Sequence, residues 1–170
     1  MPDQPSSTDA ASAHPLAPSA DGDLADALNN RLDGWNRIMG LRFISASPDE
    51  VTAELDVAPS HLQAYGIVHG GVYSGIIETV ASVAAALWAA RNSQSVVGIE
   101  NHTSFLNAVR EGRLRVTARP LMRGRRTQVW QAAVTDRQGR TVADGKVRFL
   151  SLEAGAAIAG ETVRVKTGDK

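Results

Sequence analysis

Apolar and polar residues divide the chain into segments with distinct periodicities. The most apolar segment covers residues 72–90, where Glu78 is the only charged side chain. Only twelve residues, 79–90, follow that carboxylate before Arg91, whereas a bilayer span needs roughly 20 apolar residues. A helix that is apolar on all sides has to be covered by other elements. We therefore expect a buried central helix that begins after Gly70-Gly71 and ends near Arg91.

The other patterns predict one further helix and an antiparallel sheet. Apolar residues at helical spacing predict a single helix that ends at Gly40, and they are Leu24, Leu28, Leu32, Trp35 and Ile38. Predicted strands cover 41–46, 51–57, 95–107, 113–119, 127–135 and 141–152, with a short candidate at 162–165. Turns are expected at 47–50 and 136–140, and a loop at 59–67. This order is typical of an α+β fold in which the sheet wraps around the long helix.

Composition bounds the domain organisation. A chain of 170 residues suffices for one folded domain, which we place at residues 23–153. Residues 1–22 hold four of the seven prolines and lack the basic start and apolar run of a secretory signal, so they are predicted to be a disordered arm. Residues 154–170 are predicted to be a loose tail.

Charge and cysteine content exclude several kinds of site. Lys+Arg and Asp+Glu balance at 18 each, so the chain as a whole is not a polyanion binder. The absence of cysteine excludes disulfides, thiolate metal sites and thiol nucleophiles, and it fits a cytoplasmic protein. The histidines, at positions 14, 61, 69 and 102, show no close metal-ligand spacing. We expect no metal.

Glu78 is the first candidate for chemistry. An ionised carboxylate in an apolar helix is costly unless it is paired or used. The ordinary alternatives are a side chain that faces solvent and one that pairs with an arginine. Ser74 and Ser82 lie one turn away on either side, and Gly71 and Gly75 lie on the same part of the helix. This narrow, small and polar face leaves room for a ligand, which favours a catalytic carboxylate.

The Gly70-Gly71 turn is the second candidate. The first N–H groups of a helix lack intrahelical partners and can polarise a carbonyl or bind an oxyanion. Glycine also lets a substrate approach the backbone closely. Taken alone, the turn is explained equally well as a link between a loop and a helix. His69 and Gln63, taken singly, are also ordinary structural and loop residues.

Together these residues form a recognisable pattern. Gln63, the His69-Gly70-Gly71 turn, Glu78 and Ser82 resemble the hotdog-fold acyl-CoA thioesterases. The likeness is greatest to the branch with phenylacetate-pathway, 4-hydroxybenzoyl-CoA and 1,4-dihydroxy-2-naphthoyl-CoA thioesterases. It extends roughly from residue 39 to residue 152 and includes Val97-Gly98-Ile99-Glu100, Arg110-Glu111-Gly112 and Gln128-Val129-Trp130-Gln131.

The resemblance implies a role for each motif residue. The Gly70 N–H would polarise the thioester carbonyl, while Glu78 would either attack that carbonyl or activate the attacking water. Gln63 and His69 would orient the thioester, and Ser82 would help to hold the nucleophile. The same likeness places three further residues against the substrate: Gly71, Gly98 and Phe105. CoA would be part of the substrate, so no separate cofactor is expected.

An arginine cluster is the third candidate. Seven arginines fall between residues 110 and 126. Arg113 and Arg115 alternate with apolar residues and are interpreted as the solvated face of a strand. For the segment after them the resemblance implies contacts with the nucleotide end of CoA, because arginines bind phosphates well; it comprises Met122, Arg123, Gly124, Arg125, Arg126 and Thr127. Nucleic acid is a weaker interpretation, since few aromatics are interleaved.

One position departs from the family pattern. Some members that act on hydroxylated aryl groups have histidine where this chain has Phe105, which puts a hydroxylated aromatic substrate in doubt. His102 is either a replacement or a plain sheet residue, and the sequence leaves both open. The leading prediction is an acyl-CoA thioesterase, with a non-catalytic acyl-CoA sensor and a hotdog dehydratase or hydratase as alternatives.

Helix geometry predicts a homo-oligomer. Gly70 and Glu78 lie about 12 Å apart along one helix, whereas a nucleophile must sit within about 3 Å of the carbonyl that it attacks. Gly70 of one chain is therefore expected to face Glu78 of another across a two-fold dimer, which could pair into a dimer of dimers. Neither nucleic acid nor a membrane is an expected partner.

Overall fold

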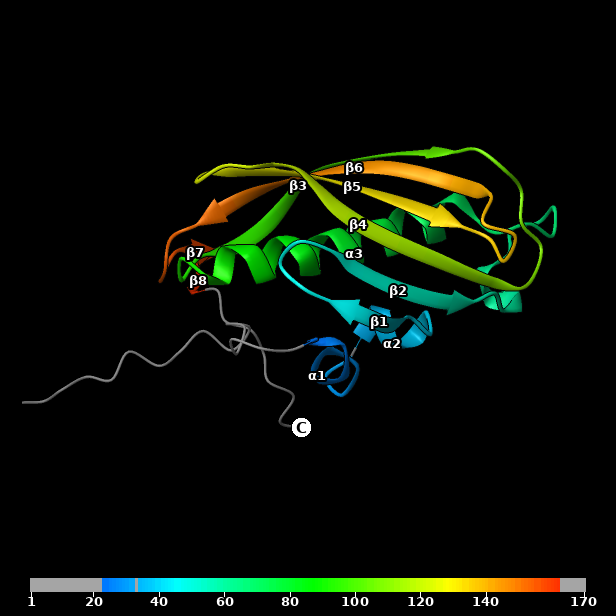
Figure 1. Cartoon of the computed structure of the whole chain (residues 1–170), viewed down its shortest axis with the longest axis horizontal. Helices are drawn as coiled ribbons and strands as arrows, with labels where there is room; N and C mark the ends of the chain where they lie inside the picture. The colour runs from blue at the N-terminus through cyan, green and yellow to red at the C-terminus, as the bar shows by residue number, and fades with distance from the viewer. Residues whose placement is uncertain (1–22, 33, 163–170) are drawn as a thin grey trace, which may run out of the picture.

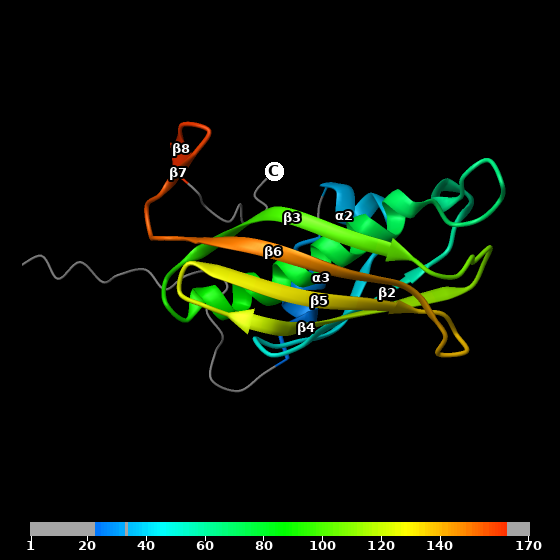
Figure 2. The same ribbon diagram turned by 90° about the horizontal axis from the view of Figure 1, so that it is seen from above.

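A computed structural model describes residues 23–32 and 34–162. One long helix, α3 (Gly70–Ala90), lies across one face of a six-stranded antiparallel sheet that curves around it (Figure 1). The strand order is β1-β2-β4-β5-β6-β3, and Figure 2 shows the long strands crossing above α3. The strands are β1 (Arg42–Ala46), β2 (Val51–Asp56), β3 (Ser95–Phe105), β4 (Arg113–Arg123), β5 (Thr127–Thr135) and β6 (Thr141–Leu152). The predicted α+β hotdog arrangement is confirmed.

The core lies between α3 and the sheet. Alternate residues of β4, β5 and β6 point inward, and Trp130 and Phe149 are fully buried against Ile76 and Ile77 of the helix. α3 is long and apolar enough, by length and composition, to cross a membrane. Its apolar residues instead form one side of this core. Burial of large apolar side chains is the main stabilising contribution of such an interface.

The predicted N-terminal helix is wrong as a single element. The structure has two short helices, α1 (Ala25–Asn29) and α2 (Gly34–Ile38). Gly34 adopts a φ of +54°, a left-handed conformation that interrupts a right-handed helix. Ile38 is 80% exposed despite its helical spacing. The predicted end at Gly40 is confirmed by its φ of +68°.

Several strand boundaries also differ from the prediction. β4 runs to Arg123, beyond the predicted end at residue 119, because its pairing with β5 continues past a register shift between Pro120 and Met122. β3 ends at Phe105 rather than at residue 107. The tail forms a small hairpin of β7 (Ala157–Ile158) and β8 (Glu161–Thr162), whereas the predicted strand was at 162–165. Residues 163–165 and the predicted arm at 1–22 lie outside the described residues.

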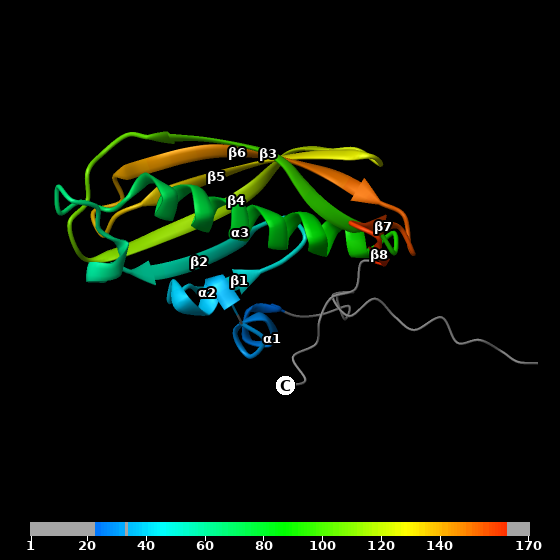
Figure 3. The ribbon, with the colours of Figure 1, turned by 180° about the vertical axis from the view of Figure 1, so that it is seen from behind.

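The two edges of the sheet differ. β1 is flanked by α1, where the Asn29 side chain donates to Phe43 O at 2.9 Å and accepts from Phe43 N at 2.8 Å; Figure 3 shows α1 and α2 below this edge. At the other edge, β3 pairs only with β6 within the described part of the chain. A short turn-like helix, η1 (Pro59–His61), leads into the loop before α3.

Candidate active site

The loop before α3 is a compact turn that fixes the position of Gln63. Gln63 N donates to Ile67 O at 2.9 Å, and Gly66 N donates back to Gln63 O at 2.8 Å. Gly66 has a φ of +68°, which glycine adopts without steric cost. Arg110 holds the outside of the turn by donating to Tyr65 O at 2.9 Å and Gly66 O at 3.1 Å. The side chain of Gln63 is therefore carried on an ordered support.

His69 caps the N-terminus of α3. Its Nδ1 accepts a hydrogen bond from Gly71 N at 2.9 Å, so the neutral ring carries its proton on Nε2 and can donate from that atom. A Cβ on Gly71 would lie 2.9 Å from the same Nδ1, so the cap requires glycine. With the N–H of Gly71 satisfied, the adjoining N–H of Gly70, at the first helical position, remains for a ligand.

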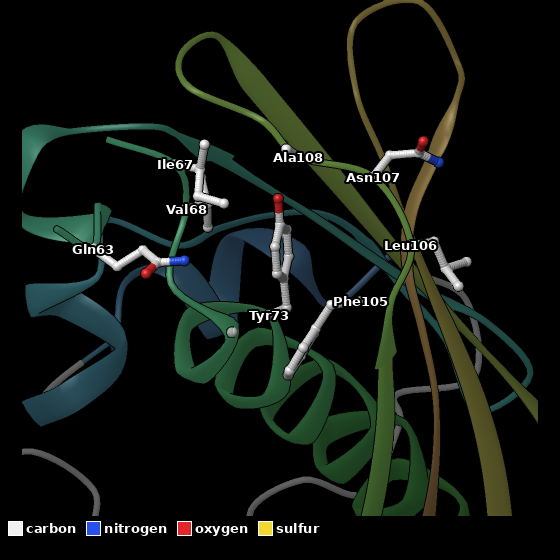
Figure 4. A pocket seen from close by; sticks show the side chains of 9 residues that line it. Gln63, Ile67, Val68, Tyr73, Phe105, Leu106, Asn107 and Ala108 are labelled. Carbon is white, nitrogen blue, oxygen red and sulfur yellow. The ribbon is translucent and has the colours of Figure 1, made fainter. Parts of the chain in front are cut away.

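A cavity of about 210 Å³ opens at this end of the helix. It is lined by Gln63, Ile67, Val68, Gly70, Tyr73, Phe105, Leu106, Asn107 and Ala108. Figure 4 shows the side chains of Gln63, Tyr73 and Phe105 around it, from the loop, from α3 and from the end of β3. Three predicted site residues, Gln63, Gly70 and Phe105, are thus brought together.

Phe105 lies directly against the start of α3. A Cβ on Gly70 would be 2.6 Å from the Phe105 ring, so glycine is required for this close approach. Phe105 is nevertheless 56% exposed. His102, the suggested replacement, is exposed on β3 opposite Lys146 and does not line the cavity.

Glu78 belongs to a second group of residues further along α3. Its side chain is half-buried, and its Oε2 accepts from Asn101 Nδ2 at 2.9 Å. Ser82 Oγ lies 3.5 Å from Oε1, the longest distance for a hydrogen bond. Oε1 also contacts Gly98, where a Cβ would collide with it. The carboxylate is only partly exposed, and its partner is an amide rather than the arginine of the ordinary alternative.

Asn101 was missed by the sequence analysis. Its Nδ2 also donates to Ser74 O at 3.1 Å, while its Oδ1 accepts from Thr103 Oγ1 at 2.7 Å. These two contacts fix the amide so that an N–H, and not the oxygen, faces Glu78. Asn101 and Thr103 are two residues apart on one face of a strand, a signal visible in the sequence. That this face meets α3 is visible only in the fold.

The arginines of β4 and of the following turn have different surroundings. Arg115 donates to Glu54 at 2.7 Å, and Arg113 lies 3.4 Å from the same carboxylate, as expected for a solvated strand face. Arg123 instead stacks on Trp88, 3.9 Å from the ring centroid, and pairs with Asp49.

The turn after β4 borders a second cavity of about 400 Å³. Its lining comprises Trp88, Asn92, Gln94, Arg123, Gly124, Arg125 and Glu153. Arg125 lies 3.5 Å from Glu153, with both side chains more than 70% exposed. Arg126 is exposed and has no ion pair within the described residues, and Gly124 N donates to Thr127 O at 2.9 Å to close the turn. Met122 is 45% exposed.

Comparison with known proteins identifies the family. A model described as "Thioesterase superfamily" matches residues 65–143. The "Putative esterase Rv1847" of Mycobacterium tuberculosis is 47% identical over 118 residues, 68% of this chain and 84% of the relative. The 1,4-dihydroxy-2-naphthoyl-CoA hydrolase of Escherichia coli is 33% identical over 114 residues, 67% of this chain and 83% of the relative. The chain belongs to the thioesterase superfamily.

Structural comparison agrees with this assignment. The solved structure of Rv1847/MT1895 superposes with a TM-score of 0.70 at 46% identity, covering 71% of this chain and 97% of that one. The protein is therefore a thioester hydrolase with the hotdog fold. The residues matched to the superfamily include both groups on α3, those around Gly70 and those around Glu78.

Metal ligands are not grouped in this thioesterase as far as the structure describes it. Within residues 23–32 and 34–162, no three His, Asp or Glu side chains are arranged to hold an ion. His61 is buried, and this burial lowers its pKa; its Nδ1 accepts from Ala58 N at 3.0 Å. His61 O accepts from His69 N at 2.9 Å, so this histidine supports the loop.

Proposed function

We propose that this thioesterase hydrolyses a small acyl-CoA to the free acid and CoA, with Glu78 as the catalytic carboxylate. The observation that carries the proposal is the half-buried carboxylate of Glu78 on α3, which accepts a hydrogen bond from Asn101. The first N–H group of the same helix, at Gly70, is available for a ligand. The similarity to the 1,4-dihydroxy-2-naphthoyl-CoA hydrolase of Escherichia coli supports the substrate class.

In the proposed reaction the Gly70 N–H polarises the thioester carbonyl. Glu78 either attacks that carbon or removes a proton from a water that attacks it. Negative charge develops on the carbonyl oxygen, where a fixed N–H at a helix terminus stabilises it. The C–S bond then breaks, and the thiolate of CoA leaves and takes up a proton. Where water is the nucleophile, this step gives the free acid directly. Where Glu78 is the nucleophile, it gives an acyl–Glu78 anhydride, which water then hydrolyses to the free acid and the regenerated carboxylate. Gln63 and His69 orient the thioester, and Ser82 helps to hold the attacking group.

We further propose that each site is shared between two chains. Gly70 lines the first cavity, whereas neither Glu78 nor Ser82 does. Along α3, Glu78 lies about 12 Å and Ser82 about 18 Å from Gly70. The edge strand β3 is long and unpaired on its outer side within the described residues. Such an edge favours pairing with another strand. A two-fold axis beside β3 would bring α3 of one chain antiparallel to α3 of its partner.

The turn Gly124–Thr127 is the proposed contact for the phosphates of CoA. Arg125 is paired only weakly and at the surface, and Arg126 is unpaired among the described residues, so both are available for an anion. Arg123 would instead shape the cavity wall through Trp88. The proposal needs no metal or further cofactor, and a cytoplasmic location remains part of it.

Release of free CoA from a panel of acyl-CoAs, measured with a thiol reagent, tests this function. A thioesterase releases CoA in proportion to the acyl-CoA consumed. A sensor would bind the same compounds, as seen by calorimetry, without release. A dehydratase or hydratase would change the absorbance of an enoyl-CoA while the thiol signal stays at background. Either of the last two results would replace the proposal.

A further inference from the structure

Tyr73 has a hydroxyl group with no partner. The residue is 3% exposed, and its hydroxyl is the one buried side-chain polar atom in the described part of the chain that makes no hydrogen bond. Buried polar groups are nearly always paired, because an unpaired one loses its contacts with water and gains nothing. An exception at a proposed active site indicates a partner that arrives with the substrate.

The Tyr73 side chain lies in the first cavity. It projects from the first turn of α3, three residues after Gly70, toward the segment 106–108 (Figure 4). The neighbouring walls are largely apolar, from Ile67, Val68 and Leu106. A volume of about 210 Å³ is below the roughly 300–1,000 Å³ of sites for drug-sized ligands. The space therefore suits a small, mainly apolar acyl group.

Phe105 connects Tyr73 to the reacting carbonyl. The two rings are 6.1 Å apart at 32°, and the Phe105 ring also covers Gly70. A thioester at the Gly70 N–H is therefore close to Phe105, whose ring is next to the Tyr73 ring. The Tyr73 hydroxyl is closed to solvent in the structure.

Within residues 23–32 and 34–162, no charged group serves as the missing partner. The charges that act on the Tyr73 hydroxyl are those of Arg140 and Asp136, and these two bind each other at 3.0 Å. Burial raises the pKa of Tyr73 to about 12. The group is therefore a neutral hydroxyl at physiological pH, able both to donate and to accept one hydrogen bond.

We propose that Tyr73 determines acyl specificity, and that the preferred acyl group is small and carries an oxygen that hydrogen-bonds the Tyr73 hydroxyl. This inference rests on the proposed acyl-CoA hydrolysis. Tyr73, on α3, would make the polar contact with the acyl group that the apolar side chain of Phe105, at the end of β3, cannot make. A site that hydrogen-bonds a substrate oxygen discriminates strongly against the analogue without it, because the protein group is then left unpaired.

Matched substrate pairs and the Tyr73→Phe variant test the inference. The substrates are benzoyl-CoA with its three monohydroxylated isomers, and butanoyl-CoA with 3-hydroxybutanoyl-CoA. We expect the wild-type enzyme to favour one hydroxylated member by about tenfold or more in kcat/KM. Tyr73→Phe should abolish that preference and leave the unsubstituted partner unchanged or faster. Tyr65→Phe is the control, since Tyr65 is 80% exposed and outside the cavity.

The outcomes separate the specificity from the function. If the wild-type enzyme turns over the substrates without preferring a hydroxylated one, the proposed role of Tyr73 is wrong. It is also wrong if Tyr73→Phe lowers kcat/KM equally for both members of a pair. In either case acyl-CoA hydrolysis would stand. No CoA release from any substrate would reject the hydrolysis itself. The thermal midpoint of free Tyr73→Phe should equal or exceed that of the wild type, because the hydroxyl has no partner to lose.

Discussion

The two groups of residues along α3 differ in how completely the protein satisfies them. The Glu78 carboxylate has a partner in Asn101, and Asn101 is itself held by Ser74 O and Thr103. Around Gly70, a helix N–H and a buried hydroxyl are both left for a ligand. A preorganised nucleophile needs no rearrangement during the reaction, whereas a binding site gains affinity from groups that the ligand completes. This difference supports the proposal, in which Glu78 is the catalytic carboxylate and the groups around Gly70 bind and polarise the thioester.

The largest effect is expected from substitution of Glu78, the proposed catalytic carboxylate. Glu78→Gln retains the shape of the side chain and a hydrogen-bond acceptor for Asn101, but it removes the base or nucleophile. We expect kcat to fall by on the order of 10³, with the fold retained by circular dichroism. Near wild-type turnover would remove Glu78 from the mechanism.

Mixed dimers test whether the two groups act across a chain boundary. Glu78→Gln and a Gln63→Ala/His69→Ala variant should each be nearly inactive alone. Random pairing after co-refolding makes about half of the dimers mixed, and each mixed dimer has one intact site, so about a quarter of wild-type activity should return. Activity that stays at the parental level while tagged subunits demonstrably exchange would mean that each site lies within one chain.

The sequence predicted the fold well because its signals were local. The apolar segment 72–90 became the core helix, and strand-like segments bounded by turn signals located the six strands of the sheet. The N-terminal helix was predicted wrongly, since spacing alone does not reveal the positive φ of Gly34. The longer β4 depended on cross-strand pairing that no single segment specifies.

The candidate site was predicted only in part for the same reason. Gln63, His69, Gly70 and Glu78 belong to one short stretch of sequence and were found from it. Asn101 reaches Glu78 from a strand 23 residues away, and its role depends on the face of β3 that meets the helix. The unpaired state of the Tyr73 hydroxyl is likewise a property of the packed fold.

Substitution of Asn101 should have a smaller effect than substitution of Glu78, because Asn101 contacts the Glu78 carboxylate without being the proposed catalytic group. Asn101→Ala removes a donor from the Glu78 carboxylate, and we expect kcat to fall by about tenfold with little change in KM. Steady-state kinetics of the variant beside the wild-type enzyme measure both parameters.

A matched control separates this effect from simple loss of packing. Asn36→Ala also removes an asparagine that hydrogen-bonds α3, through Thr79 at 2.9 Å, but on a side away from Glu78. It should lower the thermal midpoint without the tenfold fall in kcat. A positioning role for Asn101 is untenable if Asn101→Ala lowers kcat no more than Asn36→Ala does.

The smallest expected effect concerns the arginines of the turn after β4, which belong to recognition. Charge removal at Arg125 and Arg126 should raise KM for an acyl-CoA a few-fold and spare kcat, because phosphate binding is remote from the carbonyl. The wild-type KM should rise with ionic strength, since such contacts are screened by salt. Hydrolysis of a truncated thioester without the nucleotide should be the same in both variants and in the wild type.

Arg123→Ala is the contrasting variant, because this side chain stacks on Trp88 and pairs with Asp49. It should lower the thermal midpoint and affect the hydrolysis of both substrates alike. If Arg125→Ala and Arg126→Ala behave as Arg123→Ala does, the turn is structural and CoA is bound elsewhere.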